Sequence, residues 1–149
     1  MSIKLLALQD DNHHLVTKTT FESMARLELE SGGSYLVIAT GTVWAASLDR
    51  NETVTVRLSI RTGIVAQIES KTEFSANPSL SSTGHESFAL TLAADSVSGS
   101  PGPGPVIRPP SASLSAKKNT SGQGGFAVSD IRIAALPVDE IVLTTIAEQ

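Results

Sequence analysis

Residues 31–60 read SGGSYLVIATGTVWAASLDRNETVTVRLSI, and this stretch decides the fold. Its first half, residues 35–45, is apolar on both faces of an extended chain, which predicts a central strand covered on each side. After a polar tip, apolar and polar residues alternate strictly over residues 53–60, as is typical of a half-buried β-strand. The buried face of this second strand carries Val54, Val56, Leu58 and Ile60. Together the two segments predict a long hairpin in the middle of a β-sandwich.

Further alternating segments follow one another along the chain, separated by turns. They cover residues 14–21, 24–30, 64–68, 86–93, 111–116, 126–136 and 140–146. The inward phase shifts near Ser129-Asp130, which predicts a β-bulge. Residues 21–30 contain good helix formers, so a helix is the alternative there, but their period of two favours a strand. We therefore predict that residues 1–149 form one all-β domain, a two-sheet antiparallel β-sandwich of the jelly-roll type.

Composition limits what this domain can bind. The chain carries a net charge of −4 and no run of basic residues, which argues against nucleic acid as a partner. Charged residues make up only 17% of the chain, below the usual quarter, so we expect part of the surface to be covered in an assembly. No apolar stretch has the length of a membrane span, and the N-terminus lacks the features of a signal peptide, so no membrane partner is expected. The absence of cysteine excludes disulfides and thiolate metal ligands.

Residues that could carry chemistry are few. The cluster Asp10-Asp11-Asn12-His13-His14 offers carboxylates and imidazoles, but adjacent residues of an extended chain point to opposite faces. An exposed polar turn is therefore expected there rather than a metal site. His85 is expected at a solvated strand end, and Trp44 in the core rather than as a sugar-stacking platform. With no nucleophile elbow and no evident glycosidase pair, the sequence predicts no enzyme activity, no cofactor and no metal ion.

Two segments stand out as candidates for contact with a partner chain. Residues 1–12 are largely apolar and are expected to form an N-terminal arm or a short first strand, and residues 96–110 are so rich in proline and glycine that no regular structure is expected there. Prolines restrict the loop before binding and so lower the entropy lost on docking. The predicted partner-binding residues are Ile3, Leu5, Leu6, Leu8, Val106, Ile107 and Arg108. The alternative is that both segments pack on their own sandwich.

Four short motifs carry a resemblance to a known class of protein. They are Gly33-Ser34-Tyr35-Leu36-Val37-Ile38-Ala39, Thr55-Val56-Arg57-Leu58, Ser87-Phe88-Ala89-Leu90 and Ile131-Arg132-Ile133-Ala134-Ala135. Together they resemble the β-sandwich virion structural proteins of tailed phages, which serve as capsid decoration or cement proteins and as fibre heads. The resemblance implies a non-enzymatic domain, commonly a homotrimer, bound to a capsid or tail.

These observations lead to one functional hypothesis and two rivals. The leading hypothesis is a capsid cement or decoration subunit that stabilises a phage head by bridging coat subunits. Its partner would be the major capsid protein or another virion protein, and it would be found in the virion after assembly in the host cytoplasm. The first rival is a carbohydrate- or receptor-binding head domain of a fibre or tail. The second rival, an enzyme on a jelly-roll scaffold such as a cupin, lacks the paired His/Glu metal motif.

Overall fold

The computed structural model describes residues 5–45, 52–62, 66–75, 85–101, 107–119 and 125–142. Within these ranges the chain contains eleven β-strands and no helix. The strands are β1 Leu6–Asp10, β2 His14–Val16, β3 Glu22–Glu28, β4 Ser34–Ala45, β5 Thr53–Thr62, β6 Ala66–Ser75, β7 Glu86–Ala94, β8 Ser100–Pro101, β9 Ile107–Arg108, β10 Ser111–Lys118 and β11 Phe126–Val138.

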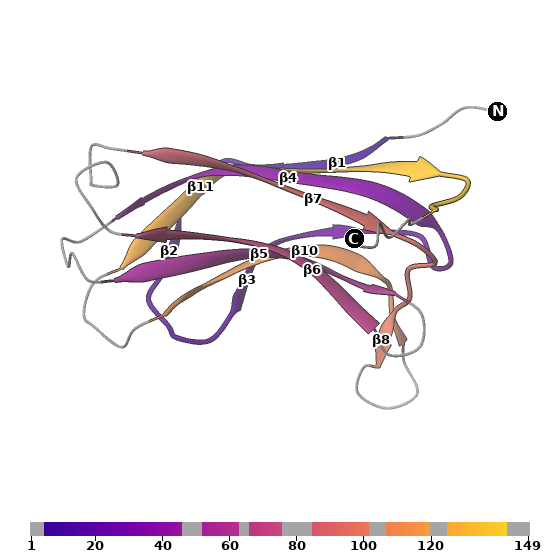
Figure 1. Cartoon of the computed structure of the whole chain (residues 1–149), viewed down its shortest axis with the longest axis horizontal. Helices are drawn as coiled ribbons and strands as arrows, with labels where there is room; N and C mark the ends of the chain where they lie inside the picture. Colours follow the sequence, from indigo (N-terminus) through magenta and orange to yellow (C-terminus); the bar gives the residue numbers. More distant parts are fainter. Residues whose placement is uncertain are drawn as a thin grey trace, which may run out of the picture.

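Two antiparallel sheets lie one above the other and form a sandwich (Figure 1). One is five-stranded, with the order β1-β11-β4-β7 and with β2 paired to β11 beyond the end of β1. The other is four-stranded, with the order β3-β10-β5-β6. Strands β8 and β9 form a separate two-stranded ribbon. The prediction of a two-sheet antiparallel β-sandwich is thus confirmed.

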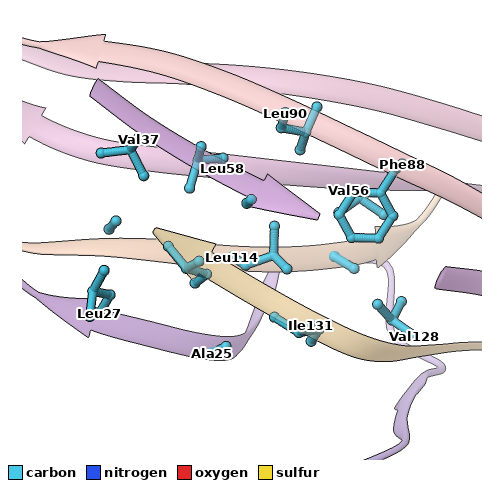
Figure 2. Close-up of a cluster of buried hydrophobic side chains, with 14 of the residues drawn as sticks. Ala25, Leu27, Val37, Val56, Leu58, Phe88, Leu90, Leu114, Val128 and Ile131 are labelled. Carbon is cyan, nitrogen blue, oxygen red and sulfur yellow. The ribbon is translucent and has the colours of Figure 1, made fainter. Parts of the chain in front are cut away.

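The hydrophobic core fills the space between the sheets. The four alternating apolar residues of β5, from Val54 to Ile60, are at most 1% exposed. In Figure 2 the side chains of Leu58 and Leu114 point from one sheet toward those of the other, among them Val37. Burying a Leu, Ile, Val or Phe side chain in this way stabilises a fold by about 1.5–3 kcal/mol. The alternation of residues 53–60 therefore correctly predicts which face of β5 is buried.

The predicted hairpin of residues 31–60 is wrong, because its two strands belong to different sheets. Strand β4 bonds to β11 and β7, whereas β5 bonds to β10 and β6. The inner faces of β4 and β5 instead meet across the core. Alternation identifies the buried face of a strand but not its hydrogen-bonded neighbour, so two consecutive amphipathic strands are as compatible with a crossing between sheets as with a hairpin.

Several predicted boundaries shift. The segment 14–21 is a strand only over β2, and the segment expected at 24–30 begins earlier, as β3, with no helix. The short strand expected at 64–68 continues to Ser75, so the predicted loop 71–84 lies partly in β6 and otherwise outside the described residues. The strand expected at 140–146 is absent over residues 140–142, and the remainder lies outside the described residues.

The predicted bulge in the last strand is confirmed. The register between β11 and β4 shifts between Ser129 and Arg132, and Asp130 has a positive φ of 53°. This left-handed conformation lets one extra residue fit into the strand without breaking the sheet. As a result, Ile131 and Ile133 point into the core in the same register as the strands beside them.

Candidate interaction face on the five-stranded sheet

Charged residues are distributed unequally between the two sheets. The strands of the five-stranded sheet carry four, namely Asp10, Glu86, Asp130 and Arg132. The strands of the four-stranded sheet carry ten, namely Glu22, Arg26, Glu28, Arg57, Arg61, Glu69, Lys71, Glu73, Lys117 and Lys118. The five-stranded sheet is therefore the layer that is poor in charge. Its outer face, which points away from the other sheet, is the candidate interaction face.

One end of this outer face is apolar. Leu5, Leu36, Ile38 and Leu136 are exposed by 56%, 37%, 43% and 40%, and we call this group the apolar patch. Leu36 lies directly opposite Leu136, and Ile38 lies opposite Ala134 in the same pair of strands. Leu5 immediately precedes β1, whose first residue pairs with Ala135, so it continues the patch across β11. The prediction that β4 is covered on both faces is therefore wrong, because these outward side chains have no covering layer among the described residues.

The middle of the face contains a shallow depression of about 520 Å³, with both polar and apolar groups in its lining. It is lined by Asp11, Thr40, Gly41, Thr42, Ser87, Phe88, Ala89, Asp130 and Arg132. The lining contains three hydroxyl groups, two carboxylates and one guanidinium group, but no histidine. The depression can donate and accept hydrogen bonds, and it can form ion pairs with charged groups of a partner.

The far end of the face carries Trp44, which the sequence analysis wrongly expected in the core. The indole is only partly buried and stacks on His85, with ring centres 4.5 Å apart and an angle of 18° between the planes. His13 approaches the same indole edge-on, with ring centres 5.0 Å apart. Leu15 is 68% exposed and lies in β2. It pairs with Ala127 of β11, which pairs with Trp44 on its other side. We call Trp44, His13, His85 and Leu15 the aromatic cluster.

The cluster Asp10–His14 forms a hydrogen-bonded polar turn. Asp10 Oδ1 accepts the backbone N–H of Asn12 at 2.9 Å, and Oδ2 lies 2.7 Å from His14 Nε2. The donated backbone hydrogen bond, followed by the contact with His14, holds the pKa of Asp10 below its ordinary value of 3.8. Across the described part of the chain, no three His, Cys, Asp or Glu side chains gather into a group that could hold a metal ion.

Several charged side chains on the outer face of the four-stranded sheet interact with one another. The Arg57 guanidinium lies 3.8 Å from the centre of the Phe21 ring, and its Nη1 lies 3.6 Å from Glu69 Oε2. Lys71 Nζ approaches the other oxygen of Glu69 at 3.0 Å, and this hydrogen bond is the main reason why the pKa of Glu69 is lowered. Three charged groups on this outer face thus have interaction partners within the chain.

The predicted N-terminal contact segment is divided between the core and the surface. Leu6 and Leu8 lie in β1 and pack against the core of their own sandwich, whereas Leu5 joins the apolar patch. Ile3 lies outside the described residues. The structure thus brings one of the four predicted arm residues to the candidate face.

The proline-rich segment 96–110 is anchored to the sandwich and contains the ribbon β8–β9, although no regular structure was expected there. Val97 is buried and exchanges backbone hydrogen bonds of 2.8 and 2.9 Å with Gly32 and Gly33. Arg108 is exposed, and the backbone of Ile107 pairs with that of Pro101. Val106 and the side chain of Ile107 lie outside the described residues.

Sequence reasoning missed Leu36, Ile38 and Leu136, although a signal for the first two exists. In the first apolar segment, Thr40 and Thr42 share their phase with Leu36 and Ile38. Hydroxyl side chains mark the outward side of a strand, so the same phase should have placed these apolar residues, and Trp44, on the surface.

Comparison with known proteins identifies the fold. No protein-family model and no curated protein matches the sequence. In the described part of the chain, no helix is long and apolar enough to cross a membrane. A solved structure of the Gx strain of infectious bursal disease virus matches with a TM-score of 0.60 and 6% identity, over 90% of this chain and 32% of that one. The Gt strain of the same virus matches with a TM-score of 0.55 and 9% identity, over 89% and 32%. This chain therefore spans about a third of the length of these viral chains and shares with them its β-sandwich fold.

Proposed function

We propose that this protein is a non-enzymatic structural component of a virion, and that it attaches to its partner through the apolar patch on the outer face of the five-stranded sheet. The apolar patch is the observation that carries the proposal. Four large apolar side chains lie together on a sheet whose strands carry few charges, a composition typical of a surface that another protein covers. The shared fold with the viral structures supports the same conclusion.

The finer assignment is a capsid cement or decoration subunit that bridges coat subunits. The depression beside the apolar patch would accept hydrogen bonds at the rim of such a contact, and Arg132 would meet a carboxylate of the partner. The partner would be the major capsid protein or another virion protein with an apolar, charge-poor surface. Many weak contacts repeated over a symmetric lattice hold each subunit more firmly than one contact does.

The proline-rich loop and the arm keep a supporting role in this proposal. Arg108 is exposed and could pair with the partner, and Leu5 belongs to the apolar patch. Leu6 and Leu8 contribute by packing on the core, which fixes β1 at the edge of the sheet beside the patch.

The attachment test compares outward-facing substitutions on one sheet. Ile38→Ser and Leu136→Ser remove exposed apolar area from the patch, whereas Leu15→Ser removes a similar area at the other end of the same face. We expect the tagged wild-type protein and Leu15→Ser to co-sediment with virus particles from the source of the protein, and the two patch variants to lose most of their occupancy. Quantitative mass spectrometry of the particles measures the copy number. Wild-type protein that stays at the top of the gradient would overturn the proposal.

The oligomeric state that the resemblance implies is a homotrimer. Sedimentation velocity should then give a species with three times the 15.6 kDa chain mass. A monomer at micromolar concentration would contradict a trimer that forms without the capsid.

The aromatic cluster favours a second candidate function, the recognition of a carbohydrate or receptor by a fibre or tail head. Trp44 lies on an outer face, where an indole can contribute to a sugar-binding surface. A glycan array probed with wild-type protein and with Trp44→Ala tests this candidate. A competable hit that Trp44→Ala abolishes would favour it over attachment to a capsid, and the lack of any hit would count against it.

A further inference from the structure

Strand β7 is the last of the described strands at one edge of the five-stranded sheet. Among the described strands it pairs only with β4, through nine consecutive residue pairs without a register shift. Its sequence, ESFALTLAA, contains no proline, and its only charged residue is Glu86 at the start. Alternate residues of an edge strand direct their backbone N–H and C=O groups away from the sheet, so β7 presents a long, uncharged template for another strand.

The other edges of the sandwich carry the features that prevent such pairing. Edge strand β3 has Glu22, Arg26 and Glu28, and its pairing with β10 is interrupted by a register shift. Edge strand β6 has Glu69, Lys71 and Glu73 in alternation. The edge opposite β7 is divided between β1 and β2, which are five and three residues long. Since charges, bulges and short strands all discourage edge pairing, β7 is the exception in this domain.

We propose that β7 pairs with β7 of a second copy of this chain, antiparallel and across a two-fold axis at Leu90. Residues that face each other in an antiparallel pair lie on the same side of the sheet. An axis that passes through a residue, rather than between two residues, meets this requirement. With the axis at Leu90, inward Phe88 faces inward Leu92 of the second copy, and outward Ala89 faces outward Thr91. An axis at Leu90 also uses the whole strand, from Glu86 to Ala94.

The charge pattern of β7 selects a second copy as the occupant. In this register Glu86 lies opposite Ala94 of the second copy, so the two carboxylates are at opposite ends of the interface and do not repel each other. The outward side chains of the strand, Ser87, Ala89, Thr91 and Ala93, are small and uncharged, so they permit close approach. The strand is therefore complementary to itself.

The pairing would join the two five-stranded sheets into one continuous sheet. Their outer faces would then form a single surface with an apolar patch in each half, because β7 lies directly beside β4 (Figure 1). This inference does not depend on attachment to a capsid. A two-fold contact is also separate from a three-fold one, so a protein with both would form assemblies larger than a trimer.

The first test introduces a charge at the edge. Ala89→Lys places an ammonium group on β7, and Ala7→Lys makes the same change at an exposed outward position of β1 on the opposite edge of the same sheet. Sedimentation velocity over about 1 to 100 µM measures association of the purified protein. We expect Ala89→Lys to weaken the self-association of the wild type at least about tenfold and to halve the mass of its largest species, and Ala7→Lys to leave both unchanged.

The second test checks the register. Thr91→Glu alone should weaken association, whereas the double variant Ala89→Lys, Thr91→Glu should restore it, because each ammonium would lie opposite a carboxylate of the second copy. The proposal is overturned if the wild type does not associate over this range, or if both single lysine variants weaken association equally. Association that the double variant fails to restore would overturn the axis at Leu90. These outcomes are independent of particle binding, so they separate this inference from the proposed function.

Discussion

Removing the carboxylate of Glu52 should destabilise the sandwich more than any surface charge change. Lys118 Nζ lies 3.2 Å from Glu52 Oε1, and the two side chains are only 2% and 3% exposed. Lys118 lies opposite Val54 in the pairing of β10 with β5, so the ion pair closes one end of the four-stranded sheet. The substitution Glu52→Ala removes the carboxylate from this buried ion pair.

The expected loss is large because the charge cannot be rehydrated without opening the structure. Breaking a buried ion pair from one side costs about 3–5 kcal/mol. With a urea m-value of about 2 kcal/mol/M for a chain of this size, the unfolding midpoint should fall by about 1.5–2.5 M. Equilibrium urea unfolding followed by circular dichroism measures this shift.

A surface pair provides the control. Lys71 Nζ is closer to Glu69, at 3.0 Å, but these side chains are 51% and 36% exposed. Lys71→Ala should therefore cost less than about 1 kcal/mol, although its contact is the shorter one. If Glu52→Ala shifts the midpoint no more than Lys71→Ala does, burial does not control the strength of this ion pair and the reasoning fails. The double variant Glu52→Leu, Lys118→Met should recover most of the loss, because it leaves no buried charge.

Two further predictions concern the five-stranded sheet. Gly41 lies opposite Phe88, and a Cβ atom on Gly41 would lie 2.6 Å from the ring, so Gly41→Ala should cost about 1–3 kcal/mol and lower the thermal midpoint by about 2–4 °C per kcal/mol. An unchanged midpoint, or no relief in the double variant with Phe88→Leu, would contradict this close packing. The pKa of Asp10 is lowered in the folded state, so its contribution to stability is present above its unfolded pKa and is lost as the pH falls through the folded value. The urea midpoint should thus change less between about pH 5 and pH 2 in Asp10→Asn than in the wild type. The same change of midpoint with pH in both proteins would refute this contribution of Asp10.

Local alternation was enough to predict the class of fold. A residue's phase in a strand depends only on its neighbours in sequence, so the buried faces of β3, β5 and β7 could be recognised without knowing which strands pair. The shift of phase near Asp130 likewise predicts the bulge that the structure contains. These features rest on interactions that reach two or three residues along the chain.

The pairing of strands could not be derived in the same way. Strand β4 lies between β11 and β7, which come roughly ninety and fifty residues later, and nothing in residues 34–45 specifies those neighbours. Any strand with an apolar inner face fits such a position equally well. The hairpin predicted for residues 31–60 failed for this reason.

The position of the candidate face follows from the difference between the two outer surfaces. The low charge of the sequence predicts a covered surface but does not locate it, because composition has no direction. Once the strands are assigned to sheets, the charged side chains are concentrated on the four-stranded sheet, where Arg57, Glu69 and Lys71 bind one another. The five-stranded sheet has the apolar patch, the aromatic cluster and an unprotected edge strand. A sandwich whose charges lie mainly on one sheet, and whose other sheet exposes an apolar patch, has one outer face that is better suited than the other to being covered by another protein.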